Sequence, residues 1–535
     1  MISRDSHRRR FLPWLVLLCT LLTQATKQEL YAQQLVVVCP AQFTEAIKPW
    51  LQRRVSEGYA VRVIPPRETA ERTKTEVIAA FTALLNGQDG PKSLNKSVAS
   101  DTQCSRFLFL IGDVPTLGKE CDVNVQVPTF YQPAEVTVAW GSTPTIPTDT
   151  PYTDLNIDGK PDAAVGRLPA DGPQQIRDWT ARLFQREDQV EEVNWRSEVQ
   201  LVGGVGGFGA FADRAIESVA STIVTGVLPT EVRTHVLYGS PGHRFYPLKG
   251  TFSDAVVDQF SRGARFWVYA GHGQVTELDR VPPDRDGIPV LDRKSIRRLA
   301  CAPAKAPVAL LLACYTGALD AAEDSISEAM LFSPGGPVAL ISGSRITMPY
   351  GNASLAVELI HSFYVERCAT LGQAWLRAQC ALLKEMPSDK QPIRVMIDGL
   401  AALISPSATN LAGERREHVL LYGLIGDPTQ KMAHGETMEV VTMAGHDRLA
   451  PVKVSCVSPI AGMLNVRVDR PLGAEFSGDP NRTLLAESSV EVGEGESTEI
   501  TLNLDPEVSG PLVLRAMVSG GGRFATGATK TIIRP

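Results

Sequence analysis

The chain has 535 residues, of which 44% are hydrophobic, and a formal net charge of -6. This length and composition predict about two to four globular domains with buried cores and exclude an intrinsically disordered chain. Because the basic residues form no block beyond the extreme N-terminus, we expect no nucleic-acid partner.

The first residues have the pattern of a secretory signal peptide. A basic cluster at residues 8–10 precedes an apolar run at 11–22, which is shorter than the ~20 residues that a membrane span requires. We expect a signal peptide over 1–25, cleaved near Ala25 or alternatively near Ala32. The paired arginines also fit a twin-arginine signal. The mature protein is therefore expected to be secreted or held in the periplasm or cell envelope, without a membrane span.

Two α/β subdomains are expected next, at 33–190 and 191–432, because short apolar runs alternate with amphipathic segments. In the first, the pattern predicts strands at 35–40, 59–66, 106–115 and 161–169 and helices at 46–58, 73–87 and 172–188. The stretch from 116 to 153, rich in proline and threonine, is expected to be an irregular surface excursion.

In the second subdomain, the pattern predicts strands at 199–209, 233–239, 264–271, 307–317, 337–344 and 418–428 and helices at 211–224 and 254–263. Ser325 and Glu328 fit a helix capping box. Residues 204–209 satisfy GxGxxG, but the next strand ends in Tyr238 and Gly239 rather than in an acid. A tight strand-to-helix turn is therefore favoured over a dinucleotide site.

The sequence pattern changes at residue 435, and from there apolar and polar residues alternate to the end of the chain. The alternation predicts an immunoglobulin-like β-sandwich of about 100 residues at 435–535. The expected strands are 437–443, 452–458, 463–469, 497–505, 511–518 and 527–534. Such domains commonly bind or pack, so we expect a protein or surface partner for this one.

His272 and Cys314 each stand at the carboxyl end of a strongly apolar run. In an open parallel sheet, functional groups gather at this end of the strands. If the two strands are neighbours, imidazole and thiol share one cleft, where the imidazole promotes thiol ionisation and protonates a departing amine. We expect the backbone N–H groups of Gly273 and Cys314 to bind a developing oxyanion.

Several stretches resemble the gingipain family of cysteine peptidases, which belongs to the same broad clan as caspases and legumains. They are the His-Gly and Ala-Cys strand ends and the segments 106–115, 151–170, 314–346 and 424–429. The resemblance extends from about 35 to 430. It implies a caspase-like α/β fold followed by a β-sandwich, a Cys-His dyad acting through an acyl-enzyme, and a protein or peptide substrate, with no cofactor needed for the chemistry.

The resemblance also implies an acidic residue that supports the histidine. Asp213 and Glu217 are the candidates, and a solvated helix face is the alternative for both. Cleavage after arginine or lysine is what the family implies, although no residue of this chain is assigned to an acidic specificity pocket.

A DxNxDG pattern follows the irregular excursion. Its spacing lets alternate oxygens point toward one cation while Gly159 permits the tight turn. Val165 stands where an EF-hand has its glutamate, so an EF-hand is excluded. A calcium loop of another geometry and an ordinary Asx turn are the two alternatives for Asp154, Asn156, Asp158 and Asp162.

Two functions are compatible with these observations. The first is a secreted cysteine endopeptidase in which Cys314 attacks the peptide carbonyl and His272 protonates the leaving amine. The alternative is a catalytically degenerate relative that acts as a binding or secretion-associated module. We favour the endopeptidase because both dyad residues are present.

Overall fold

The computed structural model describes residues 33–86, 106–190, 193–206, 210–282, 287–385, 392–405, 407–442, 451–474 and 478–534. The expected signal peptide lies outside these residues, as does the second half of the glycine-rich turn at 204–209. Within the described ranges, no helix is long and apolar enough to cross a membrane.

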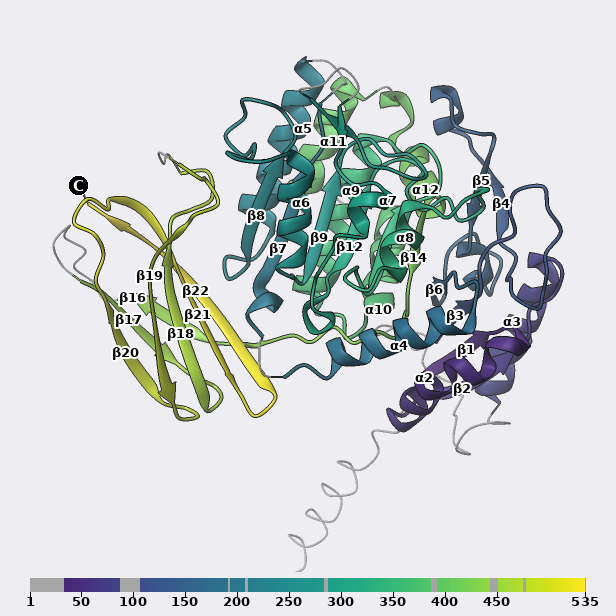
Figure 1. The fold of residues 1–535 in the computed structure, drawn as a ribbon, viewed down its shortest axis with the longest axis horizontal. Helices are drawn as coiled ribbons and strands as arrows, with labels where there is room; N and C mark the ends of the chain where they lie inside the picture. The colour runs from purple at the N-terminus through teal and green to yellow at the C-terminus, as the bar shows by residue number, and fades with distance from the viewer. Residues whose placement is uncertain are drawn as a thin grey trace, which may run out of the picture.

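One ten-stranded sheet contains strands from both expected α/β subdomains (Figure 1). In spatial order the strands are β2 (Ala60–Ile64), β1 (Gln34–Val38), β3 (Arg106–Ile111), β6 (Ala164–Leu168), β14 (Tyr422–Ile425), β13 (Ala339–Gly343), β12 (Val308–Leu312), β9 (Phe266–Ala270), β7 (Glu198–Gly203) and β8 (Arg233–Tyr238). The strands β1, β6, β12 and β13 are buried at every residue. Burial on both faces explains why their sequences are mainly apolar rather than alternating, although β6 also buries Arg167 and β13 also buries Ser342.

The two halves of the sheet meet where β6 lies beside β14. Only Ile425 and Arg167 are in register there, and the N–H of Gly426 donates to the carbonyl of Arg167 at 2.7 Å. The strand β14 is parallel to β6 but antiparallel to β13. The sheet is therefore mixed at this seam, which differs from the all-parallel arrangement that the sequence predicts.

Helices cover both faces of the sheet. On β1, Leu35 and Val37 share a core with Trp50 of α2, whereas Val36 and Val38 share the opposite core with Phe81 of α3. The helices are α2 (Thr44–Ser56), α3 (Ala70–Leu85), α4 (Pro173–Glu187), α5 (Ala210–Thr222), α6 (Phe252–Ser261), α7 (Arg293–Ile296), α8 (Ile326–Phe332), α9 (Pro349–Ile360), α10 (Leu371–Leu383), α11 (Pro392–Ile404) and α12 (Leu411–Leu421).

Two sequence predictions are wrong in this unit. The strand predicted at 418–428 is shorter, because α12 continues to Leu421 with Glu417 and His418 buried on it. The stretch 116–153 is not an irregular surface excursion, because β4 (Phe130–Pro133) pairs with β5 (Thr145–Thr148) within it. The Glu417 carboxylate also accepts backbone N–H groups of this stretch, including that of Val136. A single buried acid thus fixes a segment whose sequence has no periodic pattern.

The C-terminal β domain consists of two sheets. One contains β15 (Glu436–Thr437), β22 (Arg523–Ile533), β21 (Gly510–Gly520), β18 (Gly462–Asp469) and β19 (Leu484–Val492), and the other contains β16 (Glu439–Thr442), β17 (Val452–Val457) and β20 (Ser497–Leu502). Val454 of one sheet and Val466 and Leu514 of the other belong to one buried core. The sequence missed β19, and the immunoglobulin-like topology stays a prediction.

The β domain adjoins the β8 side of the large sheet (Figure 1). The side chain of Asn481 accepts from the N–H of Val236 in β8 and donates to its carbonyl, both at 2.8 Å. Arg515 donates to the carbonyl of Thr230 at 2.8 Å and to the Asp469 carboxylate at 3.0 Å. The bonds of Asn481 and the Arg515–Thr230 bond fasten the two units, and Asp469 holds Arg515 from within the β domain.

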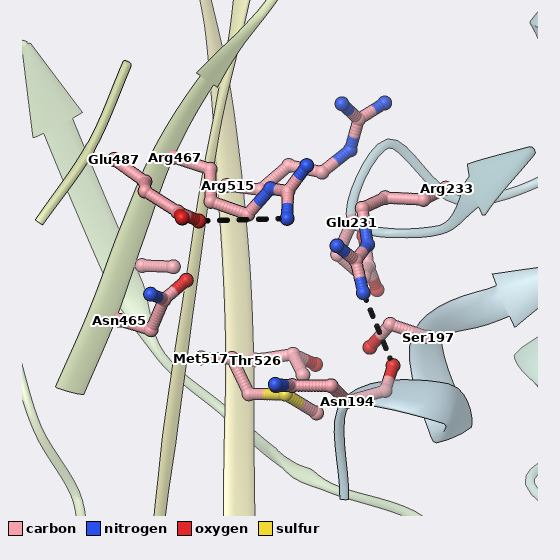
Figure 2. Close-up of a pocket in the computed structure, with 11 residues that line it drawn as sticks. Asn194, Ser197, Glu231, Arg233, Asn465, Arg467, Glu487, Arg515, Met517 and Thr526 are labelled. Atoms are coloured by element: carbon pink, nitrogen blue, oxygen red, sulfur yellow. Dashed lines mark hydrogen bonds and ion pairs between the residues drawn. The ribbon is translucent and has the colours of Figure 1, made fainter. Parts of the chain in front are cut away.

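A cavity of about 60 Å³ lies at this junction (Figure 2). Its walls come from both units and include Arg233 and Glu231 on one side and Arg467, Glu487 and Arg515 on the other. Burial, together with the neighbouring positive charges of Arg467 and Arg515, lowers the pKa of Arg233. The junction is thus charged and incompletely filled.

Candidate functional site

The loops that carry His272 and Cys314 leave the sheet side by side. The strands β9 and β12 are parallel neighbours, and Ala270 is in register with Leu312. Each candidate residue stands two positions beyond this last pair, so both lie at the same level of the carboxyl edge. The side chain of His272 is exposed and that of Cys314 is half-buried.

The His272 loop is anchored through its main chain. The carbonyl of His272 accepts a hydrogen bond from the hydroxyl of Tyr269 at 2.7 Å and another from the N–H of Asp279 at 3.1 Å. Burial raises the pKa of Tyr269 far above its usual range, so this hydroxyl stays protonated and remains a donor. The Asp279 carboxylate accepts from the N–H of Val205 at 2.9 Å, which ties the loop after β7 to the His272 loop.

The Cys314 loop is fixed by the loop that follows β13. The next residue, Tyr315, has a φ of 57°, a left-handed conformation that is uncommon for a non-glycine residue. Its N–H donates to the carbonyl of Arg345 at 3.1 Å. The Arg345 guanidinium forms two hydrogen bonds, at 2.9 and 2.6 Å, with the buried carboxylate of Asp320. These bonds offset the strain and hold the cysteine in place.

Gly273 is the point at which the two loops touch. A Cβ atom at this position would lie 2.8 Å from the carbonyl oxygen of Cys314, 2.8 Å from Cγ2 of Thr316 and 2.9 Å from Cβ of Ala313. Two of these three atoms belong to rigid parts of the cysteine loop. The glycine after the histidine is therefore required by the close approach of the two segments.

The helix α8 joins the same two loops. At its N-terminus, the N–H of Ile326 donates to the carbonyl of Val275 in the His272 loop at 2.6 Å, and the N–H of Ser327 donates to that of Thr316 in the Cys314 loop at 3.2 Å. The capping box predicted from Ser325 and Glu328 is confirmed. Sequence reasoning thus identified the cap but not its function of connecting the two loops.

Two buried carboxyl groups lie behind this helix end. Burial is the main cause that raises the pKa of Asp113 to about 7, and the charge of Asp171 adds to it. Burial also raises the pKa of Glu328 well above its usual range, and the charge of Asp113 adds to it. Glu328 belongs to α8, so one member of this pair is on the helix that braces both loops.

The sequence did not mark Thr347, which contacts the Cys314 sulfur, or Asn352 and Tyr422, which are linked to Thr347 by hydrogen bonds. The N–H of Thr347 donates to Sγ at 3.3 Å, and Oγ1 of Thr347 lies 3.8 Å from it. Asn352 donates to Oγ1 of Thr347 at 3.1 Å and accepts from the hydroxyl of Tyr422 at 2.7 Å. No sequence motif marks these residues, because they come from the turn before α9, from α9 itself and from β14.

The structure places the other predicted site residues but does not establish their roles. The N–H groups of Gly273 and Cys314 belong to the two touching loops, and their role as oxyanion donors stays a prediction. Asp213 and Glu217 are on α5. Glu217 is exposed, and its charge acts on His243, where it partly offsets the effect of burial, which lowers the pKa of that histidine. A supporting role for either acid stays a prediction.

The DxNxDG segment forms a loop in which side-chain oxygens accept backbone N–H groups. Asp154 accepts from the N–H groups of Asp158 and Gly159 at 3.0 and 3.1 Å, and Asn156 accepts from that of Asp158 at 3.1 Å. Asp162 accepts from the N–H of Leu155 at 3.0 Å. In the described part of the chain, no three His, Cys, Asp or Glu side chains gather as a metal site. These bonds fit an Asx-turn loop, and calcium binding stays a prediction.

Comparison with known proteins identifies similar sequences and folds. The sequence model of peptidase family C25 matches residues 28–433. No curated protein sequence matches the chain. The crystal structure of the Arg-specific cysteine proteinase gingipain R is similar, with a TM-score of 0.51 and 15% identity over 95% of this chain and 99% of that chain. A structure described as a protease has a TM-score of 0.54 and 13% identity over 94% of this chain and 98% of the other.

Proposed function

Because the chain belongs to peptidase family C25, we propose that it is a cysteine endopeptidase that uses Cys314 and His272. The observation that carries the proposal is the register of β9 and β12, in which Ala270 pairs with Leu312. This register brings an exposed imidazole and a half-buried thiol to one level of one sheet edge. The alternative, a catalytically degenerate binding or secretion-associated protein, needs neither group.

The reaction follows from the chemistry of these groups. The Cys314 sulfur attacks the peptide carbonyl carbon, and the backbone N–H groups of Gly273 and Cys314 bind the resulting oxyanion. His272 gives a proton to the leaving amine as the carbon–nitrogen bond breaks. Water then attacks the acyl carbon while the neutral imidazole accepts its proton. The carbon–sulfur bond breaks, the carboxylic acid product leaves, and the imidazolium returns the proton to sulfur.

The test is labelling with a thiol-directed peptidyl inhibitor, followed by digestion of a peptide library. We expect the wild-type protein to be labelled at Cys314 and to cleave peptides, while Cys314→Ala and His272→Ala lose cleavage. Cys301→Ala is the matched control, because this buried thiol stands outside the site. If wild type neither reacts nor cleaves, the binding alternative is favoured. The library also determines which residue precedes the cut.

Further proposals concern the rest of the chain. Residues 1–25 export the protein, and the β domain, as an immunoglobulin-like module, binds a protein or surface partner. Asp154 and its neighbours bind a structural calcium ion, while the peptide chemistry itself needs no cofactor. Calorimetric titration of calcium into wild type and Asp154→Asn tests this site, and heat that is equal in both proteins excludes it.

A further inference from the structure

The loop after β13 is in direct contact with the Cys314 sulfur through Thr347. The N–H of Thr347 donates to Sγ at 3.3 Å, and the thiol in turn donates to the carbonyl of the same residue at the longer distance of 3.7 Å, a bond that is lost when the thiol ionises. The thiol is thus in contact with the main chain of one buried residue, on an element different from the one that carries the histidine. A backbone N–H aimed at sulfur favours the thiolate over the thiol, because the anion is the stronger acceptor.

The position of Thr347 is fixed from several directions. The N–H of the next residue, Met348, donates to Nε2 of the buried His418 at 3.1 Å, whose Nδ1 lies 2.8 Å from the carbonyl of Glu414. His418 therefore carries its proton on Nδ1 and is neutral, in agreement with burial, which lowers its pKa. These contacts hold the Thr347–Met348 peptide group, which directly follows the Thr347 N–H, and so limit the movement of Thr347.

A hydrogen-bonded row holds the Thr347 side chain as well. Tyr422 is fully buried, and burial keeps its pKa high, so its hydroxyl donates to Oδ1 of Asn352. This bond fixes the Asn352 amide, whose nitrogen then donates to Oγ1 of Thr347. The row runs from β14 through α9 to the residue that contacts the sulfur.

We propose that the Thr347 N–H stabilises the Cys314 thiolate and that Asn352 and Tyr422 are positioning residues that hold this donor against the sulfur. The inference rests on the proposed function only in taking Cys314 as the nucleophile. It adds a third component to the reactive centre, contributed by the turn between β13 and α9. The thiol proton is transferred to the imidazole or to solvent. The negative charge on the sulfur is then stabilised by a hydrogen bond from a backbone N–H, a group that does not titrate.

The experiment measures the alkylation of Cys314 by iodoacetamide as a function of pH, with the labelled peptide quantified by mass spectrometry. In alkylation the sulfur–carbon bond forms and iodide leaves, so no peptide cleavage is needed. All variants are made in full-length protein that carries His272→Ala, which removes the imidazole as a source of activation. Variants whose melting temperature falls by more than a few degrees are excluded.

We expect Asn352→Ala to slow alkylation at pH 7 roughly tenfold and to move the midpoint of the pH profile upward by about one unit, because a misplaced donor stabilises the anion less. Asn352→Asp should slow it further, since a carboxylate cannot donate to Oγ1 of Thr347 and adds a negative charge beside the residue that contacts the sulfur. Thr347→Pro, which removes the N–H itself, should reproduce the effect if it folds. Tyr422→Phe should slow alkylation less, about threefold.

Thr153→Val is the matched control. It removes a buried hydroxyl that donates to the carbonyl of Thr150, outside the cysteine loop, and it should leave the pH profile within about twofold of the parent. A profile that Asn352→Ala and Asn352→Asp both leave unchanged would overturn the inference. The two proposals can fail separately. If the protein has no peptidase activity but alkylation of Cys314 still depends on Asn352, the role of Thr347 is supported and the proposed function is not. If the protein cleaves peptides but the pH profile of alkylation does not change in the Asn352 variants, the proposed function is supported and the role of Thr347 is not.

Discussion

The carboxyl edge of the ten-stranded sheet and the junction with the β domain are held together in different ways. At the edge, main-chain groups of two loops and of α8 bond to one another, and Gly273 leaves no room for another carbon atom. At the junction, single side chains such as Asn481 and Arg515 reach across to backbone carbonyls beside a cavity of about 60 Å³. The edge is therefore defined by chain geometry, whereas the junction depends on interactions that can be removed one at a time.

The largest expected effect is that of Gly273→Ala. A methyl group would lie 2.8 Å from the carbonyl oxygen of Cys314, so the two loops must separate. Because displacement of reacting groups by about 1 Å costs on the order of 100-fold in rate, we expect peptide hydrolysis to fall by about that factor or more. Steady-state kinetics on a peptide substrate measure this. Gly399→Ala, where a Cβ meets nothing within 4 Å, is the control and should retain full activity.

The next effect concerns the pH dependence of stability at the edge. The pKa of Asp113 is raised to about 7, mainly by burial, and Asp171, Arg167 and Glu328 also act on it. The folded protein therefore holds this proton more tightly than the unfolded chain, whose carboxyl groups have a pKa of about 4. The stabilisation is complete below about pH 4 and is lost as the pH rises through about 7.

Between pH 5 and pH 8 we expect the free energy of unfolding to fall by about 2 kcal/mol on this account. Urea denaturation at both pH values measures the change, and Asp113→Asn should reduce it by removing the titrating group. A wild-type protein that is equally stable at both pH values would contradict the expectation.

The smallest effect is expected at the junction. Asn481→Ala removes two hydrogen bonds to Val236, and it should lower the free energy of unfolding by about 1 to 2 kcal/mol without affecting peptide hydrolysis. Asn465→Ala is the matched control, since Asn465 also lines the junction cavity but its amide bonds to Ser489 of the same domain rather than across the junction. Urea denaturation distinguishes the two. If Asn481→Ala reduced peptide hydrolysis as strongly as Gly273→Ala, the conclusion that the junction and the sheet edge are independent would be wrong.

The sequence predicted the sheet edge because its evidence was local. Strands buried on both faces are recognisable as apolar runs, and a polar residue at the end of such a run marks the edge. The places of His272 and Cys314 at the ends of neighbouring strands were predicted in this way, and the register of β9 and β12 agrees.

What the sequence did not predict depends on contacts between distant segments. Thr347 contacts the sulfur through its N–H, a group that every non-proline residue has, so no residue type marks it. The strand β14 follows directly after α12, which ends at Leu421, and it pairs antiparallel with β13, a distant segment. The strand β19 has mostly exposed or half-buried residues, and its weak alternation hid it.

The amide of Asn481 has a consequence for the solubility of the protein. It offers one acceptor and one donor to the peptide groups of Val236, as a residue of an additional strand would. An edge strand with free peptide groups is a template on which other molecules pair and aggregate. By occupying one such pairing position on β8, the β domain protects this end of the sheet from self-association.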